Sequence, residues 1–546
     1  VLHSHIPWVL HHGQWPHGLH WLCEAAAESY LPLLEIIERL EAGGTPVRAG
    51  IGITPILANQ LATIEFRHAL RAWFAERLAG LEHPPSGVPP SITTWWRDRL
   101  RGAWARFERD GGDILGPLSR LADSGAVELL GSSATHALLP LLARDESIRL
   151  HLAVGRLEHR RLLGRDPGGC WLPECGYRPR ERWAPGFGAP RTGLRRGIDE
   201  HLADAGYRYC IVDAHMAGMG SPPGWWSGTQ RAPFHPADAV LFSPDPENSP
   251  YMARRIKGKS GGGGVTALVR DPVGSRLVWD RGTGYPGDPA YLEFHRHSPW
   301  DGLRYWSIGR ENVPLEHRDW YDPADARRRA KDHARHLLET LSHAAGPAPG
   351  ACITLPFDTE LFGHWWSEGP EFLGSVWSAI AAHPTLVPST PGEYLRRYPP
   401  SEQIRLSAGT WGAGGDFRHW LNDRTAWLWG RVWSLEQKFW DSAGTALSSP
   451  SRHPLLAQAG RELLLAQASD WPFMLTNGEA SDYAERRFSQ HCTDAELLVG
   501  AMGDDDADLP GALRRAGELQ RRDNIFPGIL TAIRAAVSGS RAMKLS

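Results

Sequence analysis

The chain has 546 residues, of which 42% are hydrophobic and 22% charged, so it is globular and not largely disordered. Its formal net charge of −3 gives no electrostatic attraction for nucleic acid or an anionic membrane, and no apolar run is long enough for a transmembrane helix. Six scattered cysteines and the lack of a signal-peptide pattern favour a reduced, cytoplasmic protein. The 25 tryptophans stand out, because indole faces suit both protein cores and the apolar faces of sugar rings.

The first part of the chain alternates short apolar strands with helical patterns. An apolar segment that carries His3 and His5 precedes a predicted helix over 21–41. The segment VRAGIGITPIL predicts a second strand, which ends at a Thr-Pro helix start, and residues 60–122 are predicted to be mostly helical. This alternation is typical of a parallel α/β sheet or barrel.

Further apolar strands are predicted to end in polar side chains. The polar residues at these strand ends are Thr135, His136, Glu174, Asp213, His215 and Asp358. Parallel α/β barrels place their active sites at the carboxyl ends of the strands. The pattern therefore predicts that these side chains surround one site.

Glu174 and Asp358 are the candidate catalytic pair, since each follows an apolar strand and a nearby proline. Cleavage of a glycosidic bond needs one carboxylate that attacks or stabilises and one protonated carboxyl group that donates to the leaving oxygen. The alternative is that each residue caps a helix or pairs with an arginine, because structural ion pairs are common.

His3 and His5 alternate along a predicted strand, so their side chains share one face. They are either buried barrel histidines or, with a third ligand such as Asp213, His215 or Asp358, part of a metal-dependent carbohydrate hydrolase. The sequence has no ligand run of the H-E-x-x-H kind, so we expect neither metal nor cofactor.

Helical patterns dominate from about residue 396 to the end, at 416–441, 453–469, 480–501 and 510–537. We expect an all-helical C-terminal domain over 396–546 that completes the active-site cleft. A catalytic part over 1–395 is expected to precede it, with a helical insertion at about 62–125 and a long lid loop at about 216–264.

Five segments resemble, in order, the sequence regions of glycoside hydrolase family 57. They are HSHIPWV (3–9), ELLGSSATHALLPLL (128–142), WLPECGYRP (171–179), PFDTELFGHWWSEG (356–369) and GTWGAGGDFRHWLN (409–422). The stretches GITPILANQL, LVRDPVGSRLVWDRGTGYPGDPAYLEFHR and AQASDWPF add to the likeness, which covers nearly the whole chain and is greatest to the branching members of the family.

This resemblance implies a distorted (β/α)7 barrel with a helical insertion and an all-helical C-terminal domain. It implies a retaining mechanism without metal, in which Glu174 matches the family nucleophile and Asp358 the general acid/base. Their carboxyl groups are then expected about 5–6 Å apart. A small departure is Gly176, where the family usually has alanine.

The resemblance also implies a set of substrate-binding residues. His3, His5 and His136 would line the glucose unit beside the nucleophile. The other matching positions are Trp15, Arg270, Trp279, Gly287, Trp411, Trp420 and Asp470, the last from the helical domain. Taken singly, each of these tryptophans could equally be a core residue.

The loop at 216–264 departs from the family pattern. Branching members carry an aromatic residue, usually tyrosine, at its tip, whereas this chain has no tyrosine between Asp213 and Tyr251 and has Trp225 and Trp226 instead. We expect the tryptophan pair to be the apolar tip of a lid that keeps water from the glycosyl-enzyme. The alternative is that the pair packs statically on the barrel.

The leading function is cleavage of an α-1,4-glucan such as amylose and transfer of the fragment to a 6-hydroxyl, which forms an α-1,6 branch. An α-amylase or 4-α-glucanotransferase of the same family would share both carboxylates and differ in the acceptor that reaches the anomeric carbon. A non-catalytic glucan-binding protein is a third reading, and the presence of Glu174 and Asp358 disfavours it.

Overall fold

The protein is described by a computed structural model that covers most of the chain. The described ranges are 1–14, 17–189, 193–219, 249–258, 264–280, 282–309, 313–346, 349–503 and 508–539. Trp15 and the predicted lid residues Trp225 and Trp226 lie outside these ranges. No helix within them has both the length and the apolar composition needed to cross a bilayer.

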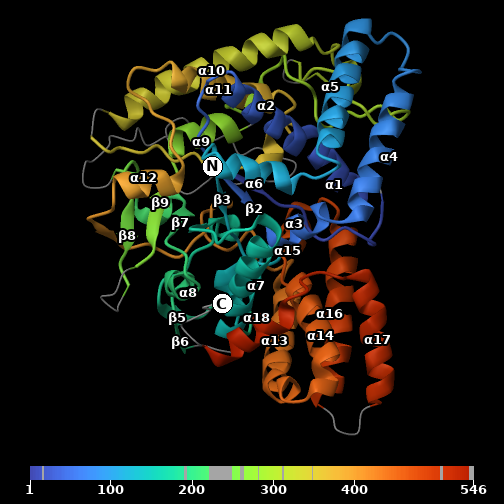
Figure 1. Ribbon diagram of the computed structural model, residues 1–546, viewed down its shortest axis with the longest axis vertical. Coiled ribbons are helices and arrows are strands. Elements are labelled where there is room, and N and C mark those ends of the chain that lie inside the picture. Colours follow the sequence, from blue (N-terminus) through green and yellow to red (C-terminus); the bar gives the residue numbers. More distant parts are fainter. Residues whose placement is uncertain are drawn as a thin grey trace.

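Ladders and bridges join short parallel strands into a ring. In ring order the seven are β1 (Leu2–Ser4), β2 (Ala49–Ile53), β3 (Val127–Leu130), β4 (Gly169–Cys170), β7 (Tyr209–Val212), β9 (Thr266–Val269) and β10 (Phe357–Asp358). Of these, β2 and β3 lie near the centre of Figure 1 and β7 and β9 to their left. Ladders join β10–β1–β2–β3 and β4–β7–β9. Single parallel bridges, Gly131 with Cys170 and Arg270 with Thr354, connect the two groups, so the predicted (β/α)7 barrel is confirmed.

The barrel is distorted at the seam between β9 and β10. Strand β8 (Arg254–Ile256) pairs antiparallel with the first half of β9 and carries β11 (Gln403–Ile404) on its other edge. The contact between the two strands is a single bridge, in which Arg270, directly after β9, pairs with Thr354, just before β10. The apolar pattern of the sequence does not predict β9. A small separate hairpin is formed by β5 (Glu181–Trp183) and β6 (Gly193–Arg195).

Helices cover the outside of the ring. They are α1 (Leu19–Ala25), α2 (Leu31–Ala42), α3 (Pro55–Leu61), α4 (Ile64–Gly80), α5 (Pro90–Arg109), α6 (Leu115–Asp123), α7 (Asp145–Leu163), α8 (Ile198–Asp204), α9 (Pro272–Trp279), α10 (Pro323–Ala345), α11 (Gly369–Ala381) and α12 (Pro391–Arg397). The predicted strand-to-helix junction after β2 is confirmed, since the Thr54 hydroxyl caps α3 by accepting from the backbone N–H of Leu57.

The helix predicted over 21–41 is interrupted. A π-helical turn at Ala26–Tyr30 separates α1 from α2 and buries all five of its residues. Such turns often mark functional sites, and this one buries Glu28 and Tyr30 inside the barrel wall. Arg304 pairs with Glu28 at 2.7 Å, which balances the buried charge.

The C-terminal part of the described chain is helical, as predicted, but with more breaks. Its helices are α13 (Ala426–Leu447), α14 (His453–Ala466), α15 (Asp470–Asn477), α16 (Ser481–Gly503), α17 (Leu509–Arg522) and α18 (Ile529–Ser538). The start predicted at 416 is delayed to Ala426, because the Thr425 hydroxyl donates to the carbonyl of Trp420 at 2.8 Å and holds a turn. Pro527 and Gly528 separate α17 from α18.

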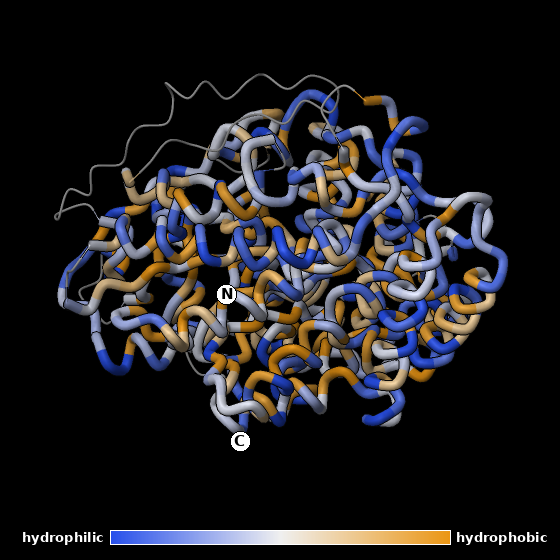
Figure 2. The backbone as a smooth tube through the Cα atoms, turned by 90° about the horizontal axis from the view of Figure 1, so that it is seen from above, coloured by the Kyte–Doolittle hydropathy of each residue, from blue (hydrophilic) through white to orange (hydrophobic). Residues whose placement is uncertain are grey.

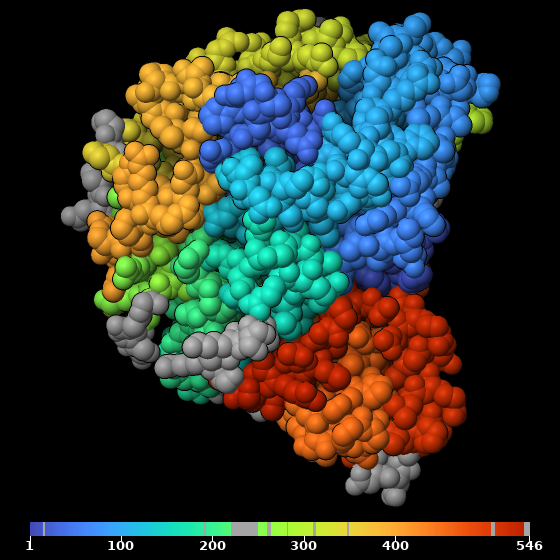
Figure 3. Space-filling model, in the orientation of Figure 1, coloured from blue at the N-terminus to red at the C-terminus, as the bar shows by residue number. Residues whose placement is uncertain are grey.

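One hydrophobic core runs from the barrel into the C-terminal helices. It joins residues around β3, β4 and β7 to those of α13, α14 and α16, while a second core lies between β1–β3 and the helices around them. Apolar segments accordingly lie inside and polar ones at the periphery (Figure 2). In Figure 3 the red and orange C-terminal helices sit directly against the blue and teal surface of the barrel.

Candidate active site

The predicted nucleophile lies on a strained turn that follows β4. Glu174 and Cys175 have positive φ angles of 59° and 51°, a left-handed conformation that costs a non-glycine residue about 1–3 kcal/mol. At Gly176 an added Cβ would lie 2.5 Å from Cδ1 of Leu138, so the alanine usual in the family would require that side chain to move. The turn thus concentrates backbone strain where the resemblance places the nucleophile.

Two distant segments hold the carboxylate of Glu174. The indole Nε1–H of Trp411 donates to Oε2 at 2.9 Å, and the hydroxyl of Ser469 donates to Oε1 at 3.2 Å. Ser469 in turn accepts from Nδ1 of His136 at 3.0 Å. Backbone bonds fix both donors, since Trp411 N–H donates to the Glu174 carbonyl and Ser469 N–H to the His136 carbonyl.

Three histidines stack beside this carboxylate. The ring of His3 lies between Trp171, with centroids 4.6 Å apart, and His136, at 5.0 Å, and His136 also stacks on His5 at 4.2 Å. Gly52 makes room for His3, because a Cβ there would lie 3.0 Å from Nδ1. His5 donates from Nε2 to the Asp470 carboxylate at 3.0 Å and accepts at Nδ1 from Thr54, a pairing that fixes its tautomer.

The stack leaves polar atoms without partners. Both ring nitrogens of His3 and Nε2 of His136 are buried and have no hydrogen-bond partner among the described residues. Burial, and repulsion from neighbouring histidines, lowers the pKa of His3 and His136 well below the usual range, so both rings are neutral at pH 7. Neutral His3 presents one donor and one acceptor, and neutral His136, whose Nδ1 donates to Ser469, presents Nε2 as an acceptor; both suit sugar hydroxyls.

Asp358 ends β10, and its backbone pairs with His3 in the ladder to β1. Burial, together with the nearby carboxylates of Glu360 and Glu174, raises the pKa of Asp358 well above its usual range. Burial also raises the pKa of Glu174 to about 7, although the hydrogen bonds from Trp411 and Ser469 oppose this rise. Hydrogen bonds from two donors stabilise the ionised form of Glu174, whereas the neighbouring carboxylates disfavour a charge on Asp358. A proton shared by the pair therefore rests on Asp358.

Glu360 is a third carboxyl group that sequence reasoning missed. It accepts from the backbone N–H of His5 at 3.0 Å and from the hydroxyl of Tyr30, and burial raises its pKa to about 7. Tyr30 comes from the π-helical turn, so that turn supports the segment carrying Asp358. The available signal was a second acidic residue inside the same PFDTE segment.

Arg270 links the barrel seam to the aromatic part of the site. Its guanidinium donates to Asp213 at 2.9 Å and to Ser275 at 2.9 Å, and it lies 5.2 Å from the ring centroid of Trp411. His215 also donates to Asp213, at 2.9 Å. Asp213, considered above as a metal ligand, thus orients Arg270, and His215 also contacts the Trp411 loop through the Gly415 carbonyl at 2.8 Å.

The remaining predicted binding residues are placed as follows. Trp279 lies 6.1 Å from Trp411, centroid to centroid. Trp420 is 1% exposed and packs beneath the Trp411 loop, where a Cβ at Gly412 would lie 2.5 Å from its ring. Gly287 ends a short 3-10 turn that packs beside α9, and Tyr285 of this turn bonds to His336 of α10 at 2.8 Å.

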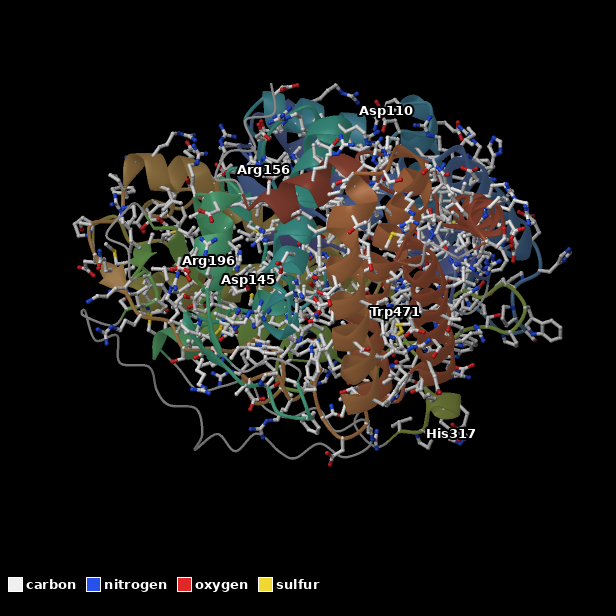
Figure 4. All side chains as sticks on the ribbon, turned by 90° about the horizontal axis from the view of Figure 1, so that it is seen from below. Asp110, Asp145, Arg156, Arg196, His317 and Trp471 are labelled. Atoms are coloured by element: carbon white, nitrogen blue, oxygen red, sulfur yellow. The ribbon has the colours of Figure 1, made fainter. Side chains whose placement is uncertain are left out.

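Within the described ranges, one group of three side chains has metal-like spacing, and it lies outside the histidine stack. We call it the buried ionic cluster: Glu462, His491 and Asp523, with Arg487, Arg522 and His12 around them. The guanidinium of Arg522 already pairs with Glu462 and Asp523, and that of Arg487 donates to Nε2 of His491, which disfavours a metal ion there. Trp471, labelled in Figure 4 among the C-terminal helices, covers the cluster 5.2 Å from Arg487.

Replacing Trp411 with phenylalanine is expected to shift the pH dependence of the reaction. The substitution removes the donor to Oε2 of Glu174, so the carboxylate loses stabilisation and its pKa rises above about 7. The acidic limb of kcat/KM should then move to higher pH by up to about one unit, with the larger loss below pH 7. The matched control Trp279→Phe removes no bond to Glu174, and an unmoved acidic limb in Trp411→Phe would contradict the assignment.

A barrel whose strand ends bring together two carboxyl groups in different environments, neutral histidines and indole rings defines an enzyme that acts on glycosidic bonds. The family model of glycosyl hydrolase family 57 matches residues 1–271, and that of the C-terminal region of 1,4-alpha-glucan branching enzyme matches residues 435–533. The chain belongs to glycoside hydrolase family 57.

Relatives cover almost the whole chain. A 1,4-alpha-glucan branching enzyme of Thermococcus kodakarensis is 35% identical over 96% of this chain and 76% of its own length. A probable 1,4-alpha-glucan branching enzyme of Mycobacterium tuberculosis is 30% identical over 98% of this chain and 97% of its own.

Solved structures agree with this assignment. The branching enzyme of Thermococcus kodakaraensis, determined in complex with glucose, superposes with a TM-score of 0.87 at 33% identity, over 97% of this chain and 95% of that one. The alpha-amylase AmyC of Thermotoga maritima gives 0.79 at 25% identity, over 97% and 98%.

Proposed function

We propose that this chain is a retaining 1,4-α-glucan branching enzyme, which cleaves an α-1,4-glucan and transfers the fragment to a 6-hydroxyl. One observation carries the proposal. The region matched to the branching-enzyme C-terminal model supplies Ser469, which donates to Glu174, and Asp470, which accepts from His5. A part of the chain typical of branching enzymes therefore belongs to the surroundings of the nucleophile.

In the first step, ionised Glu174 attacks the anomeric carbon and Asp358 gives its proton to the departing glycan oxygen. The carbon–oxygen bond to the leaving glucan breaks as the ester bond to Glu174 forms. The shared proton, assigned to Asp358 above from the hydrogen bonds to Glu174 and the carboxylates beside Asp358, supplies both groups in the required state. Trp411 and Ser469 hold the attacking carboxylate in position.

In the second step, Asp358 takes the proton of the incoming hydroxyl, whose oxygen attacks the anomeric carbon and releases Glu174. Two displacements give net retention of the α configuration. A glucan 6-hydroxyl gives a branch, whereas water gives hydrolysis. The free nitrogens of His3 and His136 would bond the hydroxyls of the glucose unit attached to Glu174.

The proposed substrate is an α-1,4-glucan such as amylose or a glycogen-like polysaccharide. We place the protein in the cytoplasm, because its six cysteines are free thiols, as a reducing compartment favours. We also propose that the 216–264 loop is a lid that excludes water from the glycosyl-enzyme. Its expected tip, Trp225 and Trp226, lies outside the described residues.

Incubation of the protein with amylose tests the proposed function. We expect proton NMR to detect new α-1,6 linkages in excess of new reducing ends. A new reducing end forms only when water attacks the glycosyl-enzyme, whereas a sugar hydroxyl gives a new glycosidic bond instead. The matched control is Glu174→Gln, which should form neither. New reducing ends without α-1,6 linkages would indicate an amylase, and rearranged α-1,4 chains without branches a 4-α-glucanotransferase; either result overturns the proposal.

A further inference from the structure

A row of four indole rings leads away from the nucleophile. Trp171 and Trp411 lie 5.3 Å apart, centroid to centroid, with their planes at 75°. Trp279 follows Trp411 at 6.1 Å and 32°, and Trp365 follows Trp279 at 6.1 Å and 84°. We call these four residues the indole row.

The row has a closed end and an open end. Trp171 is fully buried and stacks on His3, whereas Trp365 is 38% exposed. The hydrogen bond from Trp411 to Glu174 places the nucleophile beside the second ring. The row therefore runs from the closed histidine stack, past the nucleophile, to solvent.

The exposure of Trp365 has no explanation in core packing. Its neighbour Trp366 is 2% exposed and packs inward on Phe372, with centroids 4.8 Å apart, so the segment has already placed one indole in the core. The turn is rigid, because the backbone N–H of Trp365 donates to the Glu360 carbonyl at 3.1 Å and that of Trp366 to Leu361 at 2.9 Å. An exposed indole on a fixed turn is preorganised for stacking with little loss of entropy.

The segment that carries Trp365 also carries the general acid. Asp358 is followed by a 3-10 turn at Thr359–Leu361, and the bond from Trp365 returns to that turn. The acid protonates the oxygen that joins the cleaved unit to the leaving glucan, so this segment borders the leaving-glucan side of the site. The acceptor glucan enters on the side that the leaving glucan vacates.

We propose that Trp365, with Trp279, forms a stacking subsite for the leaving and acceptor glucan. This inference rests on the proposed function and specifies which part of the glucan these two rings bind. Indole faces stack on the apolar faces of glucose units, and the 84° angle between Trp279 and Trp365 offers faces to successive, differently oriented units. Trp365 is thus a binding residue for the acceptor and takes no part in proton transfer.

The test separates the two halves of the reaction with α-maltotriosyl fluoride as donor. Its carbon–fluorine bond breaks as the ester to Glu174 forms, and fluoride leaves without filling the leaving-glucan side. Fluoride release then reports the first step, and the partition of the glycosyl-enzyme between water and added maltoheptaose reports the acceptor. The protein is used whole, as wild type and as Trp365→Ala, Trp365→Phe and Trp320→Ala.

Trp320 is a matched control, because it is also 38% exposed but stacks on Trp306, at 5.7 Å and 20°, outside the indole row. For Trp365→Ala we expect unchanged fluoride release and a roughly tenfold rise in the maltoheptaose concentration needed for half-maximal transfer. Trp365→Phe should restore most of this loss, since it keeps an aromatic face, and Trp320→Ala should behave as wild type.

Slower fluoride release by Trp365→Ala with normal acceptor dependence would place the ring on the donor side and overturn the proposal. An unchanged acceptor dependence, or an equal change in Trp320→Ala, would overturn it as well. No fluoride release by the wild type would instead count against the proposed function itself. Equal unfolding midpoints of the variants exclude a loss of fold as the cause.

Discussion

Glu174→Ala is expected to lose transfer and hydrolysis together, each by about 10⁴-fold or more, because both outcomes pass through the same glycosyl-enzyme. Amylose cleavage, followed by new reducing ends and by iodine colour, measures the effect. The fold should persist, since the substitution removes a buried carboxyl group rather than an apolar contact. Residual hydrolysis near the wild-type rate would mean that another group is the nucleophile.

Asp358→Ala is expected to give an equally large loss on amylose by a different route. Without the acid, the glycan oxygen leaves unprotonated, but fluoride needs no proton to leave. Asp358→Ala should therefore keep a burst of one fluoride per enzyme from α-maltotriosyl fluoride, followed by slow turnover because the second step lacks its base, whereas Glu174→Ala should give no burst. The same response of both variants to the two donors would contradict the division of roles between them.

Asp523→Ala is expected to destabilise the protein by about 3–5 kcal/mol, because it breaks a buried charge cluster. Asp523 accepts from His12 at 2.7 Å and from Arg522 at 2.7 Å, and its side chain is fully buried. Removal leaves both partners without their shared anion. Urea unfolding followed by tryptophan fluorescence measures the change in the free energy of unfolding.

The control for this variant is Asp441→Ala. Asp441 lies 3.4 Å from Arg144, but its side chain is 56% exposed, so the loss should stay below about 1 kcal/mol. A similarly small loss in Asp523→Ala would show that the cluster does not stabilise the fold. EDTA should leave the wild-type midpoint unchanged, and a lower midpoint in EDTA would mean that the cluster holds a metal ion.

The apolar strands and the polar residues at their ends were predictable, because a buried parallel strand is a short apolar run and its carboxyl end faces the site. This logic predicted that Glu174, Asp358 and His136 follow apolar strands, and the structure places them after β4, β10 and β3. The same logic could not detect β9, whose four residues lie between a loop and a helix, or the π-helical turn, which keeps the apolar spacing of an ordinary helix.

The contacts between distant segments could not be read from the sequence. Ser469 reaches Glu174 only because the chain breaks between α14 and α15 and pairs Ala468 with Ala137. The burial of Trp420 was equally hidden, since a tryptophan in a matching motif looks the same whether it lies on a surface or in a core. A pattern of a few residues predicts local structure, whereas the contact of Ser469 with Glu174 joins residues 295 positions apart.

The bond between His5 and Asp470 spans 465 residues of chain. During synthesis the ribosome releases the barrel strands, including Glu174 and Asp358, well before the segment that carries Ser469 and Asp470. A nascent chain at that stage has both carboxyl groups but lacks the Ser469 donor to the nucleophile. The hydrogen bonds that surround Glu174 and His5 are therefore completed only late in translation, when the segment of Ser469 and Asp470 has been made.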